Sequence, residues 1–341
     1  MNNQTLFYIT TLVVYGGVDV IACLGLSMQF GVAGVVNFGF IIFQAAGAYT
    51  AAVLSLPSDR ANGAFQQYVA GLHLPFPVPW IGAAAVGGVL AIPFTGLLSR
   101  RLRTDNTAIA MLVTAVIANA LITNYRPLFN GAAGVSLVPA PLASAIDPLS
   151  LNYQYVYCGV VIAVALATFL VLRRLTASPY GRSLRAMRDN DLAAASIGTN
   201  VRGRRTAILV LGGSIAGLSG AILVGYINLW APSAWTYQET VVLIAALIVG
   251  GLGNHIGAVV GALVVPLGFE EATRYIPAFG PPGLVPALEW VIIGSLILTF
   301  LWFRPQGLVP ERRRILGLAS VRNPSTESVD LPSLKESSTD A

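Results

Sequence analysis

Residues 155–172, YVYCGVVIAVALATFLVL, form a stretch of eighteen residues without a charged side chain. A helix needs about 20 mainly apolar residues to cross the hydrocarbon core of a bilayer, so this stretch predicts a membrane span. Residues 85–98, AVGGVLAIPFTGLL, form a second uncharged stretch. Of the 341 residues, 55% are hydrophobic and only 10% are charged, against about 25% charged residues in soluble domains. The sequence therefore predicts an all-α polytopic membrane protein.

The apolar segments predict about nine transmembrane helices. The seventh and eighth are joined by GGLGNHIG at 250–257, which is too tight for a comfortable surface loop. An alternative for this pair is a re-entrant hairpin near 239–275, because irregular backbone is tolerated at membrane depth where protein buries it. In chain order, the segments are about Leu6–Gln29, Val36–Leu56, Trp80–Ser99, Asn106–Asn124, Tyr155–Leu172, Thr206–Trp230, Glu239–Gly253, Ile256–Tyr275 and Ala287–Phe303.

Positive charges are distributed unevenly between the connections. If RRLR at 100–103 is cytoplasmic, alternation of the spans also places 173–205 and everything after Phe303 in the cytoplasm. These regions hold 16 arginines and Lys335. The other side holds three arginines: Arg60, Arg126 and Arg274. Because cytoplasmic connections are enriched in Lys and Arg, seventeen positive residues against three predict an N-terminus outside and a C-terminus in the cytoplasm.

Composition changes near residue 304. Residues 1–304 are predicted to form one transmembrane domain that includes a cytoplasmic loop at 173–205. Residues 305–341 lose apolar content and gain Ser, Thr and Pro. Such a composition buries too little apolar surface to fold, so we expect a disordered cytoplasmic tail.

The residue patterns of common enzymes are missing. An ATP-binding loop requires a glycine-rich run that ends in Lys followed by Ser or Thr, and the only lysine, Lys335, lies in the tail. The two histidines, His73 and His255, have no metal-binding or catalytic spacing around them. We expect His73 in an exposed loop and His255 in a polar turn. The chain is therefore expected to be no enzyme by itself and to need no cofactor and no metal.

Asp19 is the ionisable residue deepest in the first predicted span. A lone charge at the centre of a membrane helix costs about 2.5–3.5 kcal/mol on insertion scales, so this carboxylate should face protein or water. One interpretation is that it packs against polar groups of a neighbouring helix or is protonated. The other is that it lines a path for a transported solute.

The loop at 173–205 differs sharply from its surroundings, since it contains eight arginines and two aspartates. Ser178 followed by Pro179 is typical of a helix start, and Asn190 can cap a second short helix. Gly198 is placed to end that second helix in a left-handed turn. The loop is therefore predicted to contain two short helices separated by a turn.

The first of these helices is predicted to place Leu184 and Met187 on one face and the arginines Arg182, Arg185 and Arg188 mainly around the other. The simplest interpretation is an ordinary cytoplasmic loop whose arginines only set the topology. Topology alone, however, does not require two capped helices with a face of small residues. A compact basic knob favours docking to a cytoplasmic partner.

Several motifs are distributed along almost the whole apolar part of the chain. SPYGRSLRAMRDNDLAAASIGTNV at 178–201 follows the pattern S-P-x-G-R-x-x-R-A-x-R-x-x-x-x-A-A-x-x-x-G-x-N. The others are GLSMQFGVAGVVNFGFIIFQAAGAYTAA (25–52), NGAAGVSLVP (130–139), VGGLGNHIGAVVGALVV (249–265) and FRPQGL (303–308). Together they resemble the permease subunits of branched-chain amino acid ABC transporters. LRTDNTAIAMLVTA at 102–115 and NGAAG favour the LivM type over its LivH-like paralogue.

This resemblance implies an ABC importer permease fold in a bacterial cell (inner) membrane. It also implies partners: a second, paralogous permease, two ABC ATPases below the membrane and an extracytoplasmic substrate-binding protein. The resemblance assigns ATPase coupling to the loop motif, on Gly181, Arg182, Arg185, Arg188, Asp191, Ala193, Ala194 and Gly198. No nucleic-acid partner is expected. A stand-alone secondary transporter is the alternative from another class.

Candidate residues for the translocation path come from the two glycine-rich motifs and the first span. Glycines permit close backbone approach, so simple helix packing explains them equally well. Ser27 and Phe40 depart from the family pattern, where asparagine and histidine are common, and related permeases carry urea and other small polar solutes. The solute is therefore left open between branched-chain amino acids and such compounds. The candidates are Asp19, Gly31, Gly34, Asn37, Gly39, Gly47, Gly251, Gly253 and Gly257.

Overall fold

The computed structural model describes residues 3–58, 66–99, 104–143, 145–268, 271 and 284–311. The chain divides into two units, residues 1–311 and 312–341, and the description below concerns the first. This unit extends seven residues beyond the boundary expected at 304. The expectations for RRLR at 100–103, for Arg60 and Arg274, and for the tail beyond 311 lie outside the described residues.

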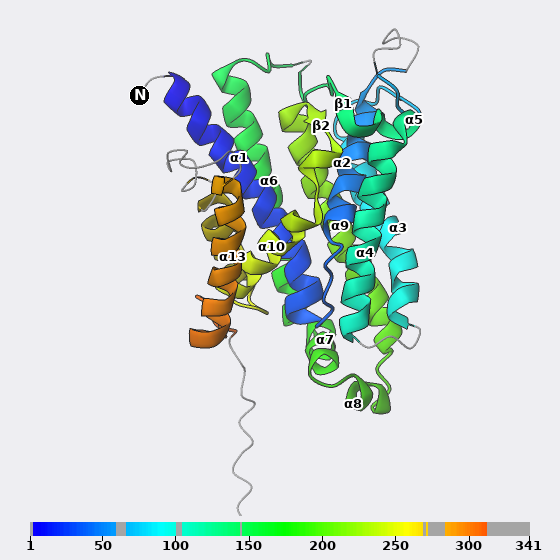
Figure 1. Ribbon diagram of the computed structural model, residues 1–341, viewed down its shortest axis with the longest axis vertical. Coiled ribbons are helices and arrows are strands. Elements are labelled where there is room, and N and C mark those ends of the chain that lie inside the picture. Colours follow the sequence, from blue (N-terminus) through cyan, green and yellow to red (C-terminus); the bar gives the residue numbers. More distant parts are fainter. Residues whose placement is uncertain are drawn as a thin grey trace, which may run out of the picture. The chain divides into compact units, whose positions relative to one another are not determined.

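The first unit is built almost entirely of helices (Figure 1). The longer ones are α1 (Asn3–Leu26), α2 (Ile41–Ser55), α3 (Val78–Ser99), α4 (Thr104–Asn124), α6 (Leu151–Ala177), α9 (Val201–Ile227), α10 (Tyr237–Gly250) and α13 (Leu284–Phe303). The shorter ones are α5 (Arg126–Phe129), α7 (Pro179–Asp189), α8 (Asp191–Ser196) and α11 (His255–Ala262). Two π-helices, Ser27–Val32 and Leu263–Leu267, continue α1 and α11.

Two very short strands, β1 (Val135–Ser136) and β2 (Leu229–Trp230), form an antiparallel pair in which Val135 faces Trp230. Two 3₁₀ turns, Gly131–Ala133 and Pro232–Ala234, lie beside them in sequence. The strands and the N-terminal end of α1 lie at one end of the unit, while α7 and α8 lie at the opposite end (Figure 1). The connections at one end therefore contain a short β-pair, and a connection at the other end contains two short helices.

Within the described residues, six helices are long and apolar enough to cross a membrane. Three further apolar helices are shorter: Ile41–Ser55, His255–Leu267 and Ala287–Phe303. The expectation of about nine long spans is therefore not confirmed. The turn between α10 and α11 occupies residues 251–254, so this hairpin is as tight as the sequence suggested. Its re-entrant character stays a prediction.

The second apolar segment differs most from expectation. A span over Val36–Leu56 was expected, but α2 begins only at Ile41. Gly34 has a φ of +69°, which ends the preceding π-helix in a conformation that side chains disfavour. Asn37 then accepts a hydrogen bond from Gly39 N (3.0 Å) in place of a helical carbonyl. The gap that was predicted between the first two spans is therefore longer than expected, and the second helix begins five residues later than predicted.

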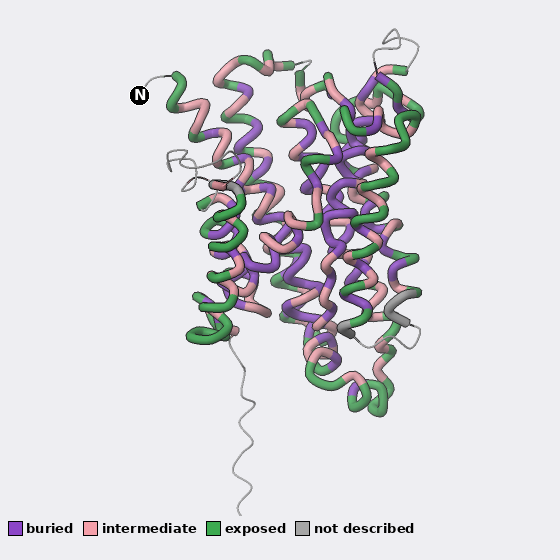
Figure 2. The backbone as a smooth tube through the Cα atoms, in the orientation of Figure 1, coloured by how far each residue is buried: buried purple, intermediate pink, exposed green. Residues whose placement is uncertain are grey.

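Helix α9 lies at the centre of the packing, where it contacts α1, α2 and α3. Figure 2 shows buried backbone concentrated along these central helices, with exposed positions on the flanks. Glycines allow the close approach: a Cβ at Gly213 would lie 2.6 Å from Gly87 O, and one at Gly217 would lie 3.3 Å from Gly87 Cα. Small residues at helix crossings are the usual way in which membrane helices pack.

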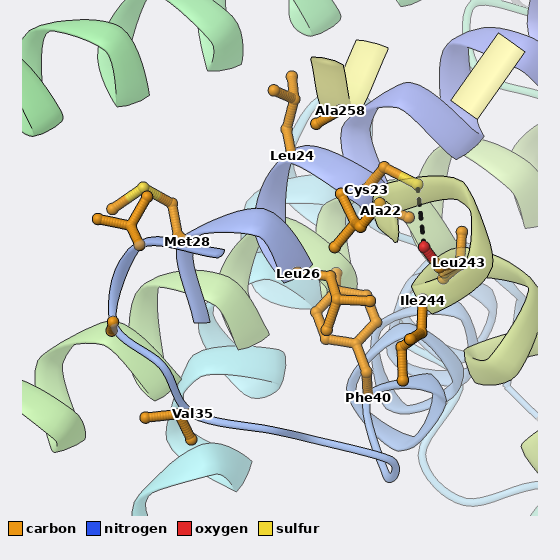
Figure 3. Packing of buried hydrophobic residues seen from close by; sticks show 14 of the residues in the cluster. Ala22, Cys23, Leu24, Leu26, Met28, Val35, Phe40, Leu243, Ile244 and Ala258 are labelled. Carbon is orange, nitrogen blue, oxygen red and sulfur yellow. Dashed lines mark hydrogen bonds between the residues drawn. The ribbon is translucent and has the colours of Figure 1, made fainter. Parts of the chain in front are cut away.

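The break between α1 and α2 lies within a buried apolar cluster (Figure 3). Met28 and Val35 come from the break, and Phe40 begins the approach to α2. Leu243 and Ile244 of α10 pack on the same cluster. Cys23 and Cys158 are both buried free thiols. Non-helical backbone at this depth is thus surrounded by protein, as its unpaired polar groups require.

Candidate functional site

The break in α1 contains a buried amide pair. Gln29 of the π-helix is fully buried, and Asn37 is 1% exposed. Asn37 Nδ2 donates to Gln29 Oε1 (2.9 Å), and Gln29 Nε2 donates to Leu209 O of α9 (3.3 Å). Single-turn π-helices occur frequently at functional sites. Asn37 was expected to contribute to the path, whereas Gln29 was missed, although it is a polar residue within an apolar segment.

One backbone group at the end of the break is satisfied by a side chain of another helix. Ile41 N, at the start of α2, donates to Thr240 Oγ1 of α10 (3.1 Å). Thr240 is fully buried. The first turn of α2 is therefore attached to α10, so a movement of α10 relative to α1 would disturb the break.

His255 is buried, contrary to the expectation of a polar turn residue. It is the first residue of α11, after the N-cap Asn254. Its Nδ1 lies 3.4 Å from Ser27 Oγ at the break, and its Nε2 lies 3.1 Å from Thr176 Oγ1 near the end of α6. The burial could not be inferred from local sequence, because the contacting residues are 228 and 79 positions away. His73 is exposed in a loop, as expected.

The loop after α6 contains the two short helices that the sequence predicted. Leu184 and Met187 are buried on one face of α7. The side chain of Asn190 accepts from Ala193 N (3.0 Å) and caps α8, and Gly198, at φ +86°, follows its end. Ser178 occupies the N-cap position of α7, but its hydroxyl donates to Leu175 O (2.6 Å) instead of capping the helix.

The arginines of α7 do not all face away from the chain. Arg182 is exposed, whereas Arg185 and Arg188 are half-buried. Arg185 Nη2 donates to Thr176 O (2.9 Å), and Arg188 donates to Gly31 O and, through Nη2, to Glu311 Oε2 (2.9 Å). Two of the three expected coupling arginines thus bind carbonyl and carboxylate groups of this chain.

The knob formed by α7, α8 and the start of α9 is held together by its own contacts. Asp191 forms an ion pair with Arg205. The Arg204 guanidinium lies over the Tyr180 ring, 5.0 Å from its centroid. Burial raises the pKa of the Tyr180 phenol, which the neighbouring Arg204 opposes. Phenol and guanidinium therefore stack with the phenol protonated at neutral pH.

Gly181 lets the first turn of α7 pack closely against the end of α6, because a Cβ there would lie 2.6 Å from the carbonyl carbon of Thr176. Among the small residues of α8, Ala193 is exposed, but Ala194 is only 2% exposed and packs inside. Ala194 therefore packs inside the knob instead of lying on its surface, and its role in coupling stays a prediction. The exposed large apolar residues of the knob are Leu192 (84%) and Ile197 (78%), which the sequence analysis did not single out.

Three of the expected path glycines meet where α7 approaches the break. A Cβ at Gly31 would lie 2.7 Å from Gly253 N. A Cβ at Gly34 would lie 2.8 Å from Arg188 Cγ. A Cβ at Gly253 would lie 2.7 Å from Glu311 Oε2. These glycines therefore make room for one another and for the arginine.

Three other glycines pack closely against neighbouring backbone. A Cβ at Gly39 would lie 3.1 Å from the carbonyl carbon of Met111, and one at Gly47 would lie 2.5 Å from that of Gly217. A Cβ at Gly257 would lie 3.0 Å from the carbonyl carbon of Gly250. Close packing accounts for these three positions.

The two remaining candidates lie outside the break. Gly251 has a φ of +121° in the turn after α10, which only glycine adopts readily. Asp19 is half-buried on α1, eight residues before the π-helix, and interacts with other groups of the chain. Among the described residues, no three His, Cys, Asp or Glu side chains gather as metal ligands would.

A broken helix with a buried amide pair, next to a knob that leaves the apolar layer, is an arrangement suited to solute translocation. The family model for the permease component of the branched-chain amino acid transport system matches residues 8–301. The chain belongs to this family. It is therefore a multi-pass membrane permease, a transporter subunit rather than an enzyme.

Individual relatives are similar over most of this permease. The high-affinity branched-chain amino acid transport system permease protein LivM of Escherichia coli (strain K12) is 26% identical over 320 residues, which cover 88% of this chain and 69% of that protein. The probable branched-chain amino acid transport permease proteins of Methanocaldococcus jannaschii are 25% identical for LivM (89% and 94% covered) and 24% identical for LivH (80% and 83% covered). No solved structure matches this permease.

Proposed function

We propose that this permease forms part of the translocation path of an ATP-driven importer of branched-chain amino acids. The observation that carries the proposal is the α7–α8 knob. It presents exposed Leu192 and Ile197 to a partner and contacts the break in α1 through Arg188. Relatives whose names assign them to branched-chain amino acid transport support the substrate class.

The importer requires other subunits. The chain has no ATP-binding loop, so two ABC ATPases are expected to bind the knob and hydrolyse the nucleotide. A paralogous permease of the LivH type is expected to complete the path in the membrane, since this chain is similar to both LivM and LivH proteins. An extracytoplasmic binding protein is expected to deliver the solute.

In the proposed orientation the knob is cytoplasmic and the N-terminus is outside, in a bacterial cell membrane. The knob, the end of α13 and its continuation to Glu311 lie at one end of the unit, which agrees with the arginine-rich connections assigned to the cytoplasm (Figure 1). The β1–β2 pair and the N-terminal end of α1 lie at the other end. The positive-inside rule supports this direction.

The path is proposed to pass the break between α1 and α2. Discontinuous helices place polar backbone and side chains at membrane depth, where a solute must exchange its water shell for protein groups. Asn37 and the glycines Gly31, Gly34 and Gly253 belong to this region, and Asp19 lies further along α1. Movement of the ATPases would reach the break through α7, which contacts it directly.

A related small polar solute such as urea is the second candidate. This alternative rests on the buried polar side chains at the break, which are two amides and a hydroxyl, all uncharged: Gln29, Asn37 and Thr240. Such groups can bind another amide as well as they bind the backbone around them.

Reconstitution tests both proposals. The permease, its paralogue and the two ATPases are placed in proteoliposomes with the binding protein, and uptake of labelled leucine and of labelled urea is measured with and without internal ATP. We expect leucine uptake only with ATP and only with the ATPases present. Leucine uptake by the permease alone, driven by an ion gradient, would overturn the importer proposal. ATP-dependent uptake of urea but not of leucine would show that urea is the substrate.

A further inference from the structure

Residues 304–311, which follow α13, run along the turn between α10 and α11. Gly307 has a φ of +70°, and a Cβ there would lie 2.5 Å from Gly251 Cα, so the two glycines allow the backbones to touch. The hydrogen bonds that attach the segment run from Leu308 N to Val249 O (2.8 Å), from Val309 N to Gly250 O (2.9 Å), and from Asn254 Nδ2 to Val309 O (3.4 Å) and Pro310 O (3.2 Å).

The segment ends with a carboxylate between two arginines of α7. Glu311 Oε2 lies 2.9 Å from Arg188 Nη2, and Glu311 Oε1 lies 3.9 Å from Arg185 Nη1. The side chain of Glu311 is only 21% exposed. A hydrogen bond between charged groups is roughly twice as strong as a neutral one, and partial burial reduces its screening by salt.

Arg188 connects this carboxylate to the break in α1. One arm of its guanidinium donates to Gly31 O, and the other donates to Glu311. The planar fork of arginine can hold two acceptors in fixed directions, which the single ammonium of lysine cannot. A Cβ at Gly253 would lie 3.0 Å from Arg188 Nη1, so glycine at this position leaves space for the fork.

We infer that Glu311 is a positioning residue for energy coupling: it holds Arg188 on Gly31 O, so that α7, the break in α1 and the α10–α11 turn move together. The inference rests on the proposed function, in which the ATPases move α7. Without the carboxylate, Arg188 keeps the Gly31 carbonyl and the exposed carboxylate of Asp189, 3.7 Å from its Nε, and its charged group gains more by turning to water. Helix α7 can then move without carrying the break with it.

This role can be separated from simple attachment of the segment. The four hydrogen bonds to Val249, Gly250 and Asn254 do not involve the Glu311 side chain. Removal of the carboxylate should therefore leave residues 304–310 in place. A purely structural role would instead lower the amount of assembled complex.

The test is made on the complete importer in proteoliposomes, where leucine uptake and ATP hydrolysis are measured in the same sample. We expect Glu311→Gln to assemble normally and to hydrolyse ATP, while the leucine taken up per ATP falls about fivefold, because the amide oxygen of glutamine can still accept from Arg188 but forms a neutral hydrogen bond of about half the strength. Arg188→Lys should show the same uncoupling although it keeps the charge. Glu311→Asp, which keeps the carboxylate, should recover part of the ratio.

Asp189→Asn is the matched control. This carboxylate lies 3.7 Å from Arg188 Nε, but its side chain is 74% exposed, so its loss should leave the ratio unchanged. A normal ratio in Glu311→Gln would overturn the inference. So would a fall in uptake and hydrolysis in proportion to the amount of complex. Absence of ATP-dependent uptake in the wild-type complex would reject the proposed function itself, whatever the variants do.

Discussion

Replacing Asn37 by leucine tests whether the buried amide pair stabilises the break in α1. Leucine has nearly the size of asparagine but can form no side-chain hydrogen bond. The substitution leaves two buried groups without their partners in the structure, Gln29 Oε1 and Gly39 N–H. Adding Gln29→Met removes the first of these groups. Leu209 O, the other partner of Gln29, lies inside α9 and keeps its helical hydrogen bond.

The magnitudes follow from this count. An unsatisfied buried polar group costs about 1–3 kcal/mol, so Asn37→Leu should lower the free energy of unfolding by about 2–6 kcal/mol. The double variant leaves only Gly39 N–H unsatisfied and should lose about 1–3 kcal/mol. The second substitution is therefore expected to restore stability, although alone it destabilises, because Gln29→Met by itself leaves Asn37 Nδ2 without its acceptor.

The assay is unfolding of the purified permease in mixed detergent micelles by increasing SDS, followed by tryptophan fluorescence. Asn124→Leu is the matched control, since Asn124 is exposed at the end of α4, and it should change stability by less than about 0.5 kcal/mol. A double variant as unstable as the sum of the two single variants would refute the reasoning, because it would mean that the two amides do not depend on each other.

Three further predictions concern the knob and the helix crossings. Leu192→Glu should leave membrane levels unchanged but weaken ATPase binding at least about tenfold, measured by co-purification, as for loss of an apolar interface anchor. Ala194→Trp should reduce the monodisperse permease recovered in detergent, because the site is buried, whereas Ala193→Trp should fold and lose only the ATPases. Gly47→Val should lower thermal stability far more than Gly159→Val, which has open space around it; equal losses would contradict close packing at Gly47.

Local features of the fold could be predicted because their causes are local. The uncharged length of residues 155–172 is a property of that segment, and helix α6 covers it. The caps of the knob also depend on neighbouring residues, so the Asn190 cap and the left-handed Gly198 were predictable. The buried pair Leu184 and Met187 followed from helical periodicity.

Errors arose where the environment depends on distant segments. Ala193 and Ala194 are equivalent in sequence, but only packing against the rest of the chain decides that one is exposed and the other buried. The segment from Val36 is apolar enough for a span, yet the chain stays irregular after the positive φ at Gly34 and through the side-chain bonds of Asn37, and α2 begins only at Ile41. His255 was assigned to a polar turn from its local sequence. Its burial was missed because its two hydrogen-bonding partners come from other helices.

The sequence by itself determined that this protein lies in a lipid bilayer, and it determined the approximate positions of the long helices, the two short helices of the knob and the family. Only the tertiary structure decided what the charged and small residues do. Arg188 and Glu311 are 123 positions apart, and Arg188 and Gly31 are 157 apart, so no local pattern reports that one guanidinium joins them. Such contacts arise from helix packing, which brings together residues whose separate sequence signals show only a charge or a glycine.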